Sequence, residues 1–316
     1  MIDFKNADFT KILRLGTRSS RLALAQVAEI HILLADNFPN LKIEIVPIQT
    51  SGDKILDKKL ADIGGKGLFV KELEEALLNN KIDIAVHSAK DVPPFIDEKT
   101  KIGAFSKRIN PNDCFISKKY SGIDKLPKNS TIGTSSPRRQ AFLAKLRPDL
   151  KFINLRGNVD TRLRKIAEDE IDATIMAVAG LVRLGKENSI NHIFTTNEII
   201  PSVGQGALAL QIRNENNAIA KICNKINDEN TETAISCERS FLQELGASCH
   251  TPVGVYAEIL DGKINLKTAI IDFNGSEIFE FNISGKANLK TAIEIGKKAG
   301  EETKIKAYNL LKKILI

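Results

Sequence analysis

Short apolar segments alternate with longer amphipathic segments through the first two thirds of the chain. The segments 12–16, 43–48 and 82–86 are short and mostly apolar, which is typical of buried β-strands. Between them, apolar residues recur at helical spacing in the segments 22–33 and 68–78. The order strand, helix, strand, helix, strand predicts a parallel sheet whose strands are joined by helical crossovers.

The same order recurs from residue 130 onward. The segments 130–133, 151–155 and 173–176 predict three further strands, and each is followed by a helical pattern. Pro137 stands at the first position of the helix after 130–133, where proline is favoured because that backbone N–H has no partner within the helix. We therefore expect two α/β domains with similar parallel sheets.

The pattern changes near residue 229. A helix is predicted for 231–245, followed by alternating apolar and polar positions in 253–259, 263–271 and 278–283. A lysine-rich amphipathic helix follows the last of these strands. This part is predicted to be a small α+β domain with a three-stranded antiparallel sheet and helices on one face.

The distribution of basic residues indicates an anionic ligand. The 316-residue chain has 46 lysines and arginines against 39 aspartates and glutamates, a net charge of +7. Of its 13 arginines, six stand close to glycine, serine or threonine: Arg18, Arg138, Arg139, Arg156, Arg162 and Arg183. A planar guanidinium group binds carboxylate or phosphate in a bidentate way. Aromatic residues make up 5% of the chain, which disfavours nucleic-acid binding, so we expect a small polyanion and no nucleic-acid partner.

Membrane insertion and secretion are not expected from this sequence. No apolar run approaches the roughly 18–20 residues that cross a bilayer, and the first residues are acidic without the apolar segment of a signal peptide. The cysteines, Cys114, Cys223, Cys237 and Cys249, form no C-x-x-C pair. This spacing argues against a structural metal site or a disulfide framework. We expect a cytoplasmic protein with no membrane partner and no metal.

Two turns have similar compositions and similar places in the pattern. Residues 16–20 (GTRSS) and 133–136 (GTSS) each end a strand and start a helix. Helix N-termini at the carboxyl ends of parallel strands offer free N–H groups and a partial positive charge. Two domains that faced each other with these edges would enclose an anion-binding cleft. The alternative is that the serines and threonines only cap the helices, as Ser20 is well suited to do.

A carboxylate and a thiol add candidate chemistry to the arginines. Asp91 follows His87-Ser-Ala-Lys90 at the end of a predicted strand, and the alternative is that it caps the turn before Pro93. Cys249 lies in a glycine-containing loop, 246–252, where a thiol is accessible, whereas Cys114 is expected to point inward from a strand.

The chain contains seven distinctive segments: GTRSS (16–20), GGKGLFVKEL (64–73), HSAKD (87–91), GTSSPRRQ (133–140), LRGNVDTRL (155–163), AVAGLVR (177–183) and VGQG (203–206). They resemble segments of the porphobilinogen deaminase family, in the family's order and over nearly the whole chain. Cys249 matches the cysteine that bears the family's cofactor. A single match of this kind arises by chance, but seven in order do not.

This resemblance implies an α/β fold in which two periplasmic-binding-protein-like domains flank a cleft. A small C-terminal α+β domain with a three-stranded antiparallel sheet completes it. The implied boundaries are 1–106 with 201–226 for domain 1, 107–200 for domain 2 and 227–316 for domain 3. Domain 1 would contain the catalytic Asp loop, domain 2 the arginine-rich anion-binding loops and domain 3 the cofactor-bearing Cys loop.

The resemblance also implies an activity. It is that of a transferase of tetrapyrrole (haem) biosynthesis, which condenses four porphobilinogen molecules head to tail into hydroxymethylbilane and releases ammonia. The chain grows on a dipyrromethane cofactor held by a thioether to Cys249, with Asp91 as the catalytic carboxylate. The implied partners are porphobilinogen and the growing polypyrrole chain, and we expect a monomer.

Matching of motifs extends the implied site to further residues. Arg18, Ser20 and Arg156 would bind the substrate. The cofactor-binding residues would be Ser88, Lys90, Thr134, Ser136, Arg138, Arg139, Arg162 and Arg183, together with Cys249. Porphobilinogen has an acetate and a propionate on its ring, so the growing chain is a polyanion of the kind that the arginines indicate.

Two other functions remain open at this point. A periplasmic-type binding protein for a small anion, without catalysis, would share the two α/β domains, but a third domain with a thiol argues against it. A nicotinamide-dependent enzyme is suggested by the G-x-G-x-x-A match at 204–209. However, 207–212 alternates like a strand, whereas that fingerprint must open a helix.

Overall fold

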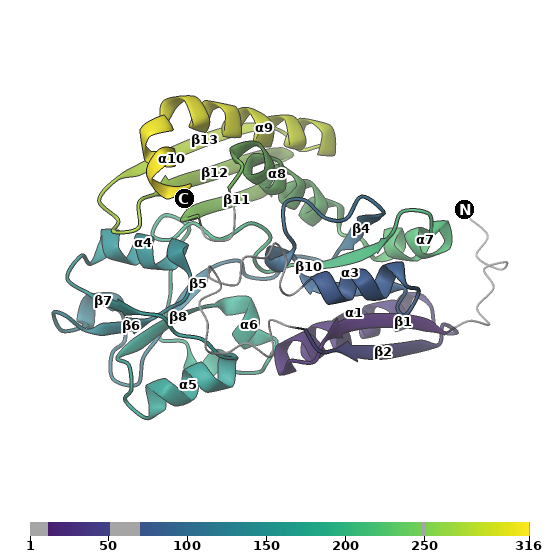
Figure 1. The fold of residues 1–316 in the computed structure, drawn as a ribbon, viewed down its shortest axis with the longest axis horizontal. Helices are drawn as coiled ribbons and strands as arrows, with labels where there is room; N and C mark the ends of the chain where they lie inside the picture. The colour runs from purple at the N-terminus through teal and green to yellow at the C-terminus, as the bar shows by residue number, and fades with distance from the viewer. Residues whose placement is uncertain (1–11, 51–69, 248–250, 316) are drawn as a thin grey trace. The chain divides into compact units, whose positions relative to one another are not determined.

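The computed structural model describes residues 12–50, 70–247 and 251–315. The chain divides into two compact units, one made of Met1–Lys107 with Ala207–Glu229 and the other of Arg108–Gly206 with Asn230–Ile316. Among the described residues, the first unit contains one β-sheet and the second contains two (Figure 1).

The first unit is built around a five-stranded sheet of described residues. Its elements are β1 (Leu13–Arg18), α1 (Arg21–Asn37), β2 (Ile43–Ile48), α3 (Lys71–Leu78), β3 (Ile84–Ser88), β4 (Thr100–Phe105), β10 (Leu208–Arg213) and α7 (Asn217–Ile226). The strand order is β2-β1-β3-β10-β4. β1 is parallel to β2 and β3, which confirms the predicted crossovers, whereas β10 is antiparallel to β3 and β4.

Apolar spacing explains which face of α1 is buried. Val27, Ile30 and Leu34 are fully buried and pack in one cluster with β1 and β3. Spacings of three and four residues lie on one face of a helix. The helix begins where the Ser20 hydroxyl accepts a hydrogen bond from the Ala23 N–H at 3.3 Å. The predicted N-cap is therefore confirmed.

The second unit contains another five-stranded sheet of described residues. Its elements are β5 (Asp113–Ile116), β6 (Thr131–Gly133), α4 (Pro137–Leu146), β7 (Lys151–Ile153), α5 (Val159–Ala167), β8 (Ala173–Ala177), α6 (Val178–Val182) and β9 (His192–Ile193). The strand order is β7-β6-β8-β5-β9. β6 is parallel to β7 and β8, and β5 is antiparallel to β8 and β9. Pro137 stands at the start of α4, as predicted.

The two five-stranded sheets share one arrangement. Each has three parallel strands in the order second, first, third, then an antiparallel strand, then an edge strand. Each also places the starts of helices after the carboxyl ends of its parallel strands. The predicted pair of similar α/β sheets is confirmed.

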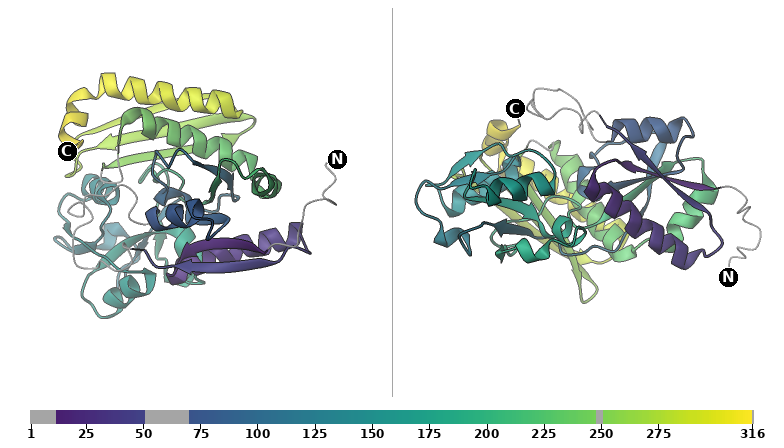
Figure 2. Two further views of the ribbon diagram at one scale, coloured as in Figure 1. Left: turned by 45° about the vertical axis from the view of Figure 1, so that its right-hand side comes forward. Right: turned by 90° about the horizontal axis from the view of Figure 1, so that it is seen from below.

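The third sheet is antiparallel and belongs to the second unit. Its strands are β11 (Val253–Leu260), β12 (Lys263–Ile271) and β13 (Ile278–Lys286), in that order, and its helices are α8 (Glu229–Leu245), α9 (Leu289–Lys306) and α10 (Tyr308–Ile314). Residues of all three helices share one apolar core with alternate residues of the strands. Figures 1 and 2 show α9 running along this sheet. The predicted small α+β domain, with helices on one face, is confirmed.

Two glycines let α8 and α9 approach closely. A Cβ atom at Gly296 would lie 2.1 Å from the Cys237 carbonyl oxygen, and one at Gly300 would lie 2.7 Å from the Glu244 Cβ. The opposite face of β12 packs against the five-stranded sheet's helix α4, because Ala269 lies in one apolar cluster with residues of α4. Both sheets of the second unit therefore share apolar packing.

A buried ion pair ties α8 to the connections beside it. The Glu238 side chain is completely buried and accepts hydrogen bonds from both terminal nitrogens of Arg108 at 2.8 Å. It also accepts from the backbone N–H groups of Gly204, at 2.7 Å, and Ala257, at 2.8 Å. The backbone N–H of Arg108 donates to the Thr231 hydroxyl at 2.9 Å. One carboxylate thus joins three separate stretches of the second unit.

Loss of the Arg108 charge is expected to destabilise the protein strongly. In Arg108→Met the buried Glu238 carboxylate keeps two backbone donors but no counter-ion, and such a loss costs about 3–5 kcal/mol of unfolding free energy. Urea unfolding measures the change. The double variant Arg108→Met/Glu238→Gln should recover most of it, because the buried charge is gone. Lys118→Met breaks an exposed pair with Asp169 and should leave the stability nearly unchanged. Equal stabilities of Arg108→Met and Lys118→Met would contradict this account.

Candidate functional site

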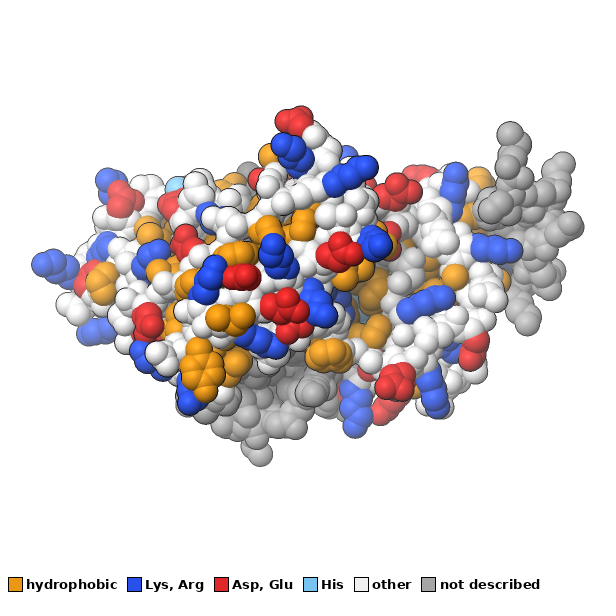
Figure 3. All heavy atoms as spheres, turned by 90° about the horizontal axis from the view of Figure 1, so that it is seen from above, with side chains coloured by type: hydrophobic (Ala, Val, Ile, Leu, Met, Phe, Trp, Pro, Cys, Tyr) orange, Lys and Arg blue, Asp and Glu red, His pale blue; other side chains and the backbone are white. Residues whose placement is uncertain are grey.

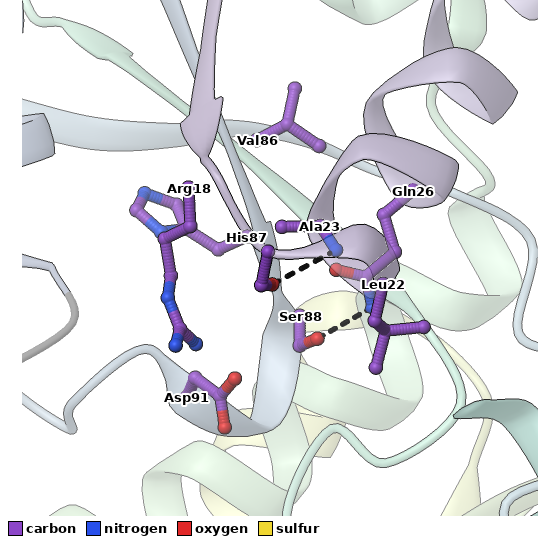
Figure 4. A pocket seen from close by; sticks show the side chains of 9 residues that line it. Arg18, Leu22, Ala23, Gln26, Val86, His87, Ser88 and Asp91 are labelled. Atoms are coloured by element: carbon purple, nitrogen blue, oxygen red, sulfur yellow. Dashed lines mark hydrogen bonds between the residues drawn. The ribbon is translucent and has the colours of Figure 1, made fainter. Parts of the chain in front are cut away.

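A small pocket in the first unit brings together four of the sequence-predicted residues. Its volume is about 50 Å³. The residues lining it are Arg18, Ser20, Leu22, Ala23, Gln26, Val86, His87, Ser88 and Asp91 (Figure 4). Arg18 ends β1 and Ser88 ends β3, and these strands are parallel neighbours. The topology therefore places both side chains at one edge of the sheet.

Hydrogen bonds hold the walls of this pocket in place. The Gln26 side-chain amide, on α1, donates to the Ser88 hydroxyl at 2.7 Å. Figure 4 shows this bond, with the Arg18 guanidinium group pointing toward Asp91. Gln26 was missed by the sequence analysis, because a glutamine on an amphipathic helix gives no local signal.

Asp91 is exposed at the edge of the pocket, at the end of a short 3-10 turn, Ala89–Asp91. Within the described part of the chain, its carboxylate makes no hydrogen bond or ion pair. The alternative role, a cap for the turn before Pro93, is therefore not what the structure shows. A carboxylate held beside a guanidinium group and open to solvent is available to a cationic ligand.

His87, which also lines this pocket, is buried and is neutral at pH 7. Burial lowers its pKa to about 4; the hydrogen bond with Gln211 opposes this shift and the positive charge of Arg18 adds to it. Its Nε2 lies 3.0 Å from the Gln211 side-chain oxygen. The Gln211 amide nitrogen donates to Glu74 at 2.7 Å and to Thr100 at 2.8 Å. The Gln211 oxygen is thus the acceptor, so Nε2 carries the histidine proton.

This buried histidine predicts a dependence of stability on pH. Between pH 6.5 and 4 the unfolded chain binds a proton at His87 that the folded protein does not, so stability falls as the pH decreases through this range. From pH 7 to 5 the loss is about 2 kcal/mol. His87→Gln retains an N–H toward Gln211 and should reduce the pH 7 to 5 difference by this amount in urea unfolding. His31→Gln, on α1, is the control. An unchanged difference in His87→Gln would show that the histidine is not the cause.

The second unit places seven predicted residues after the carboxyl ends of its three parallel strands. They are Thr134, Ser136, Arg138 and Arg139 after β6, Arg156 and Arg162 after β7, and Arg183 after β8. Because these strands are parallel neighbours, the residues gather at one edge of the sheet. The Ser136 hydroxyl caps α4 by accepting from the Arg139 N–H at 3.4 Å. The capping interpretation holds for Ser20 and Ser136, and it leaves their helix N-termini at the sites.

Arg138 and Arg139 are buried and bind a carboxylate of the chain itself. An Arg138 terminal nitrogen donates to one oxygen of Asp113 at 2.6 Å. The Nε and a terminal nitrogen of Arg139 donate to the other oxygen at 3.0 and 2.8 Å. The two side chains also donate to the carbonyl oxygens of Ile200 and Ile175, respectively. Asp113 was missed by the sequence analysis, because a lone aspartate before an apolar strand gives no sign of its distant partners.

Arg156 and Arg162 of this edge have no acidic partner among the described residues. The Nε of Arg156 is buried and has no hydrogen-bond partner among the described residues. Arg162 donates from Nε to the Gly157 carbonyl oxygen at 3.0 Å. Burial, and then the positive charge of Arg139, lower the Arg162 pKa to about 10. An orphaned donor and a desolvated guanidinium group fit a ligand with several carboxylates.

Three further residues were predicted for the site: Lys90, Arg183 and Cys249. Lys90 is exposed in the 3-10 turn next to Asp91. Arg183 follows α6 and donates to the Gly206 carbonyl oxygen at 3.2 Å. Cys249 lies outside the described residues. The three described cysteines, Cys114, Cys223 and Cys237, are buried, which confirms the inward position predicted for Cys114.

The structure bears on the nicotinamide and nucleic-acid alternatives. Residues Leu208–Arg213 form β10, so the glycines of 204–209 do not open a helix and the dinucleotide fingerprint is absent there. On the face drawn in Figure 3, basic and acidic side chains are interspersed rather than gathered into one basic patch. On α9, Lys306 pairs with Glu302 at 2.8 Å.

The described residues contain neither a membrane-spanning helix nor a group of metal-ligating side chains. In 12–50, 70–247 and 251–315, no helix combines the length and the apolar character needed to cross a bilayer. In the same residues, no three His, Cys, Asp or Glu side chains are grouped as a metal site would need.

Fold and site together define an α/β protein with arginine-containing loops at the carboxyl ends of its parallel strands. Two family models match the chain: "Porphobilinogen deaminase, dipyromethane cofactor binding domain" over residues 13–221, and "Porphobilinogen deaminase, C-terminal domain" over residues 232–304. The chain belongs to the porphobilinogen deaminase family.

Relatives named porphobilinogen deaminase are similar to this chain over most of their length. The porphobilinogen deaminase of Nitrobacter winogradskyi is 45% identical over 307 residues, which are 94% of this chain and 97% of the relative. That of Rickettsia akari is 46% identical over 293 residues, 92% of this chain and 96% of the relative.

Solved structures give a weaker likeness. A periplasmic substrate-binding protein of an ABC transporter from Coxiella burnetii has a TM-score of 0.43 at 12% identity, covering 68% of this chain and 92% of that structure. The methionine-binding protein MetQ has a TM-score of 0.43 at 15% identity, covering 68% and 87%.

Proposed function

We propose that this chain is a transferase of tetrapyrrole (haem) biosynthesis that condenses four porphobilinogen molecules head to tail into hydroxymethylbilane, with release of ammonia. Membership of the porphobilinogen deaminase family supports this proposal, as does a cofactor-binding-domain match over residues 13–221. The observation that carries it is the pocket in which Asp91, open to solvent, lies with Arg18 and Ser88. Such a pocket offers one group for a cation and others for carboxylates.

Asp91 is the catalytic carboxylate of the proposed reaction. When ammonia leaves the aminomethyl group of porphobilinogen, the C–N bond breaks with its electrons on nitrogen, and an azafulvene cation remains. A carboxylate nearby stabilises this cation, because charge that develops in the transition state is best met by a fixed opposite charge. Asp91 also accepts the proton that the attacked ring position loses when the new C–C bond forms. Arg18 and Ser20 bind substrate carboxylates beside it.

The polar edge of the second unit fits the dipyrromethane cofactor. Bound dipyrromethane supplies the free ring position from which the polypyrrole grows. The residues proposed to hold it are Thr134, Ser136, Arg138, Arg139, Arg162 and Arg183, with Ser88 and Lys90 from the first unit and a thioether to Cys249. Arg156 is proposed to bind the substrate. The orphaned Nε of Arg156 and the desolvated Arg162 support a polyanionic ligand at this edge.

Intact-mass measurement of the purified protein tests this proposal. The expected mass exceeds that of the polypeptide by two linked pyrroles, and addition of porphobilinogen gives a ladder of heavier covalent species. The matched experiment replaces porphobilinogen with a pyrrole that lacks the aminomethyl group, which should give no ladder. A protein that has only the polypeptide mass and leaves porphobilinogen unchanged after reconstitution would instead support the alternative, an anion-binding protein without catalysis.

Three further points stay predictions of the sequence. We propose domain 1 as 1–106 with 201–226, domain 2 as 107–200 and domain 3 as 227–316. The presence of three sheets supports three such domains, although the second and third sheets belong to one compact unit. A cytoplasmic location and a monomeric state are the other two.

A further inference from the structure

Asp113 is a buried carboxylate that the proposed mechanism does not use. It begins β5 and has no exposed surface. Its two oxygens accept the four hydrogen bonds of Arg138, Arg139 and Gln205, the last from the Gln205 amide nitrogen at 3.1 Å. An aspartate with four donors and no exposed surface is fully engaged by the chain.

The position of these arginines explains why a carboxylate is needed. Arg138 and Arg139 are in the first turn of α4, which contains no acidic residue. Two positive charges there are close to each other and to the partial positive charge of the helix N-terminus. Burial and Arg139 lower the Arg138 pKa, whereas Asp113 opposes this shift. Without Asp113, the two guanidinium groups would repel each other in a site with little water.

One carboxylate neutralises only one of the two arginines. A net positive charge therefore remains buried at the start of α4, and its effect reaches the next loop, because Arg139 contributes to the lowered pKa of Arg162. All three nitrogens of the Arg139 guanidinium group donate hydrogen bonds. Nε and one terminal nitrogen donate to Asp113, and the other terminal nitrogen donates to the Ile175 carbonyl oxygen at 3.0 Å. Both the position of this charge and its amount thus depend on Asp113.

Gln205 connects this cluster to the VGQG segment, which has no role in the proposed mechanism. Its amide nitrogen donates to the Pro111 carbonyl oxygen at 2.6 Å as well as to Asp113. Gly206 has φ +99°, and a Cβ atom there would lie 2.5 Å from the Ile109 carbonyl oxygen. The segment is thereby held against the stretch that leads into β5, which places Gln205 beside Asp113.

We propose that Asp113 is a positioning residue of the anion site: by holding Arg138 and Arg139 in place, it directs one uncompensated positive charge at the start of α4 toward the carboxylates of the cofactor and polypyrrole. This inference rests on the proposed function. On this account, the ion cluster of Asp113, Arg138 and Arg139 does more than stabilise the core, because it also acts on the ligand.

Two Asp113 variants test this role. Asp113→Leu leaves two buried arginines without a counter-ion and should lower the melting temperature. Asp113→Leu/Arg138→Met has the same net charge at the site as the wild type, so it should recover most of the stability. Arg139 has nevertheless lost the acceptor of two of its three hydrogen bonds, whereas Arg138→Met alone keeps that acceptor. Compared with Arg138→Met, we expect the double variant to contain much less dipyrromethane by intact mass and to show an apparent KM for porphobilinogen raised about tenfold, with a smaller change in kcat. Asp149→Asn, which breaks a surface pair with Arg147, should match the wild type.

The outcomes distinguish this role from the proposed function. A wild-type protein without dipyrromethane would contradict the proposed function. A loaded wild type together with a double variant whose loading and KM equal those of Arg138→Met would contradict only the role of Asp113. Should the variants not fold, ¹⁵N spectra of arginine side chains in the cofactor-free wild type decide instead. An Arg139 Nε–H protected from solvent exchange supports the role, and rapid exchange overturns it.

Discussion

Asp91→Asn is expected to lower the turnover of porphobilinogen about a hundredfold or more. An amide cannot supply the negative charge that stabilises the cation left when ammonia departs. Asparagine has nearly the same size as aspartate, and the Asp91 carboxylate makes no hydrogen bond or ion pair among the described residues that the change would break. Folding and cofactor content should therefore remain close to those of the wild type. The measurement is the rate of hydroxymethylbilane formation, with intact mass and melting temperature recorded on the same sample.

Glu98→Gln is the matched control for this change. Glu98 is also an exposed carboxylate of the first unit, but it does not line the pocket. Its removal should leave turnover within about twofold, as expected of a surface residue remote from the chemistry. Turnover of Asp91→Asn within several-fold of the wild type would remove Asp91 from the mechanism.

Cys249→Ser is expected to abolish the excess mass of the purified protein and, with it, the porphobilinogen ladder. A serine hydroxyl is far less nucleophilic than a thiolate, so the thioether should not form. The polypeptide should have the mass that its residues give, and it should not form hydroxymethylbilane. Intact mass spectrometry before and after addition of porphobilinogen measures both effects.

The described cysteines provide the control. Burial raises the pKa of Cys114, Cys223 and Cys237 to about 12, so each is a poor nucleophile at neutral pH. Cys223→Ala, on α7, should keep the full excess mass. An excess mass that persisted in Cys249→Ser would place the attachment elsewhere in the chain.

Local patterns predicted the strand–helix repeats because their signals are contiguous. The ranges 43–48 and 263–271 agree with β2 and β12 at both ends. β4, β9 and α7 were not predicted. β9 has two residues, and its place in the sheet depends on pairing with β5, which adjacent residues do not encode. A strand at an edge or between distant partners is defined by tertiary contacts more than by its own sequence.

The candidate site shows the same division. Motif matching named Arg18, Ser20, Ser88 and Asp91, and the structure brings all four to one pocket. The sequence indicated the arginines as ligands for an anion outside the chain, but it could not reveal that Arg138 and Arg139 already share Asp113. Such partners are 25 and 26 residues apart and meet only when β5 and α4 are packed. Chemistry that depends on one loop is readable in sequence, whereas charge balance is a property of the folded chain.

The position of β10 has a consequence for biosynthesis on the ribosome. This strand lies between β3 and β4, yet more than a hundred residues separate it from either. A nascent chain that has released β4 must therefore present two unfilled strand edges while the whole second sheet is being made. Unpaired edges promote association with other chains, and closure over long sequence distances is slow. Translation past residue 213 is thus the step that ends this exposure, and chaperone demand should be greatest just before it.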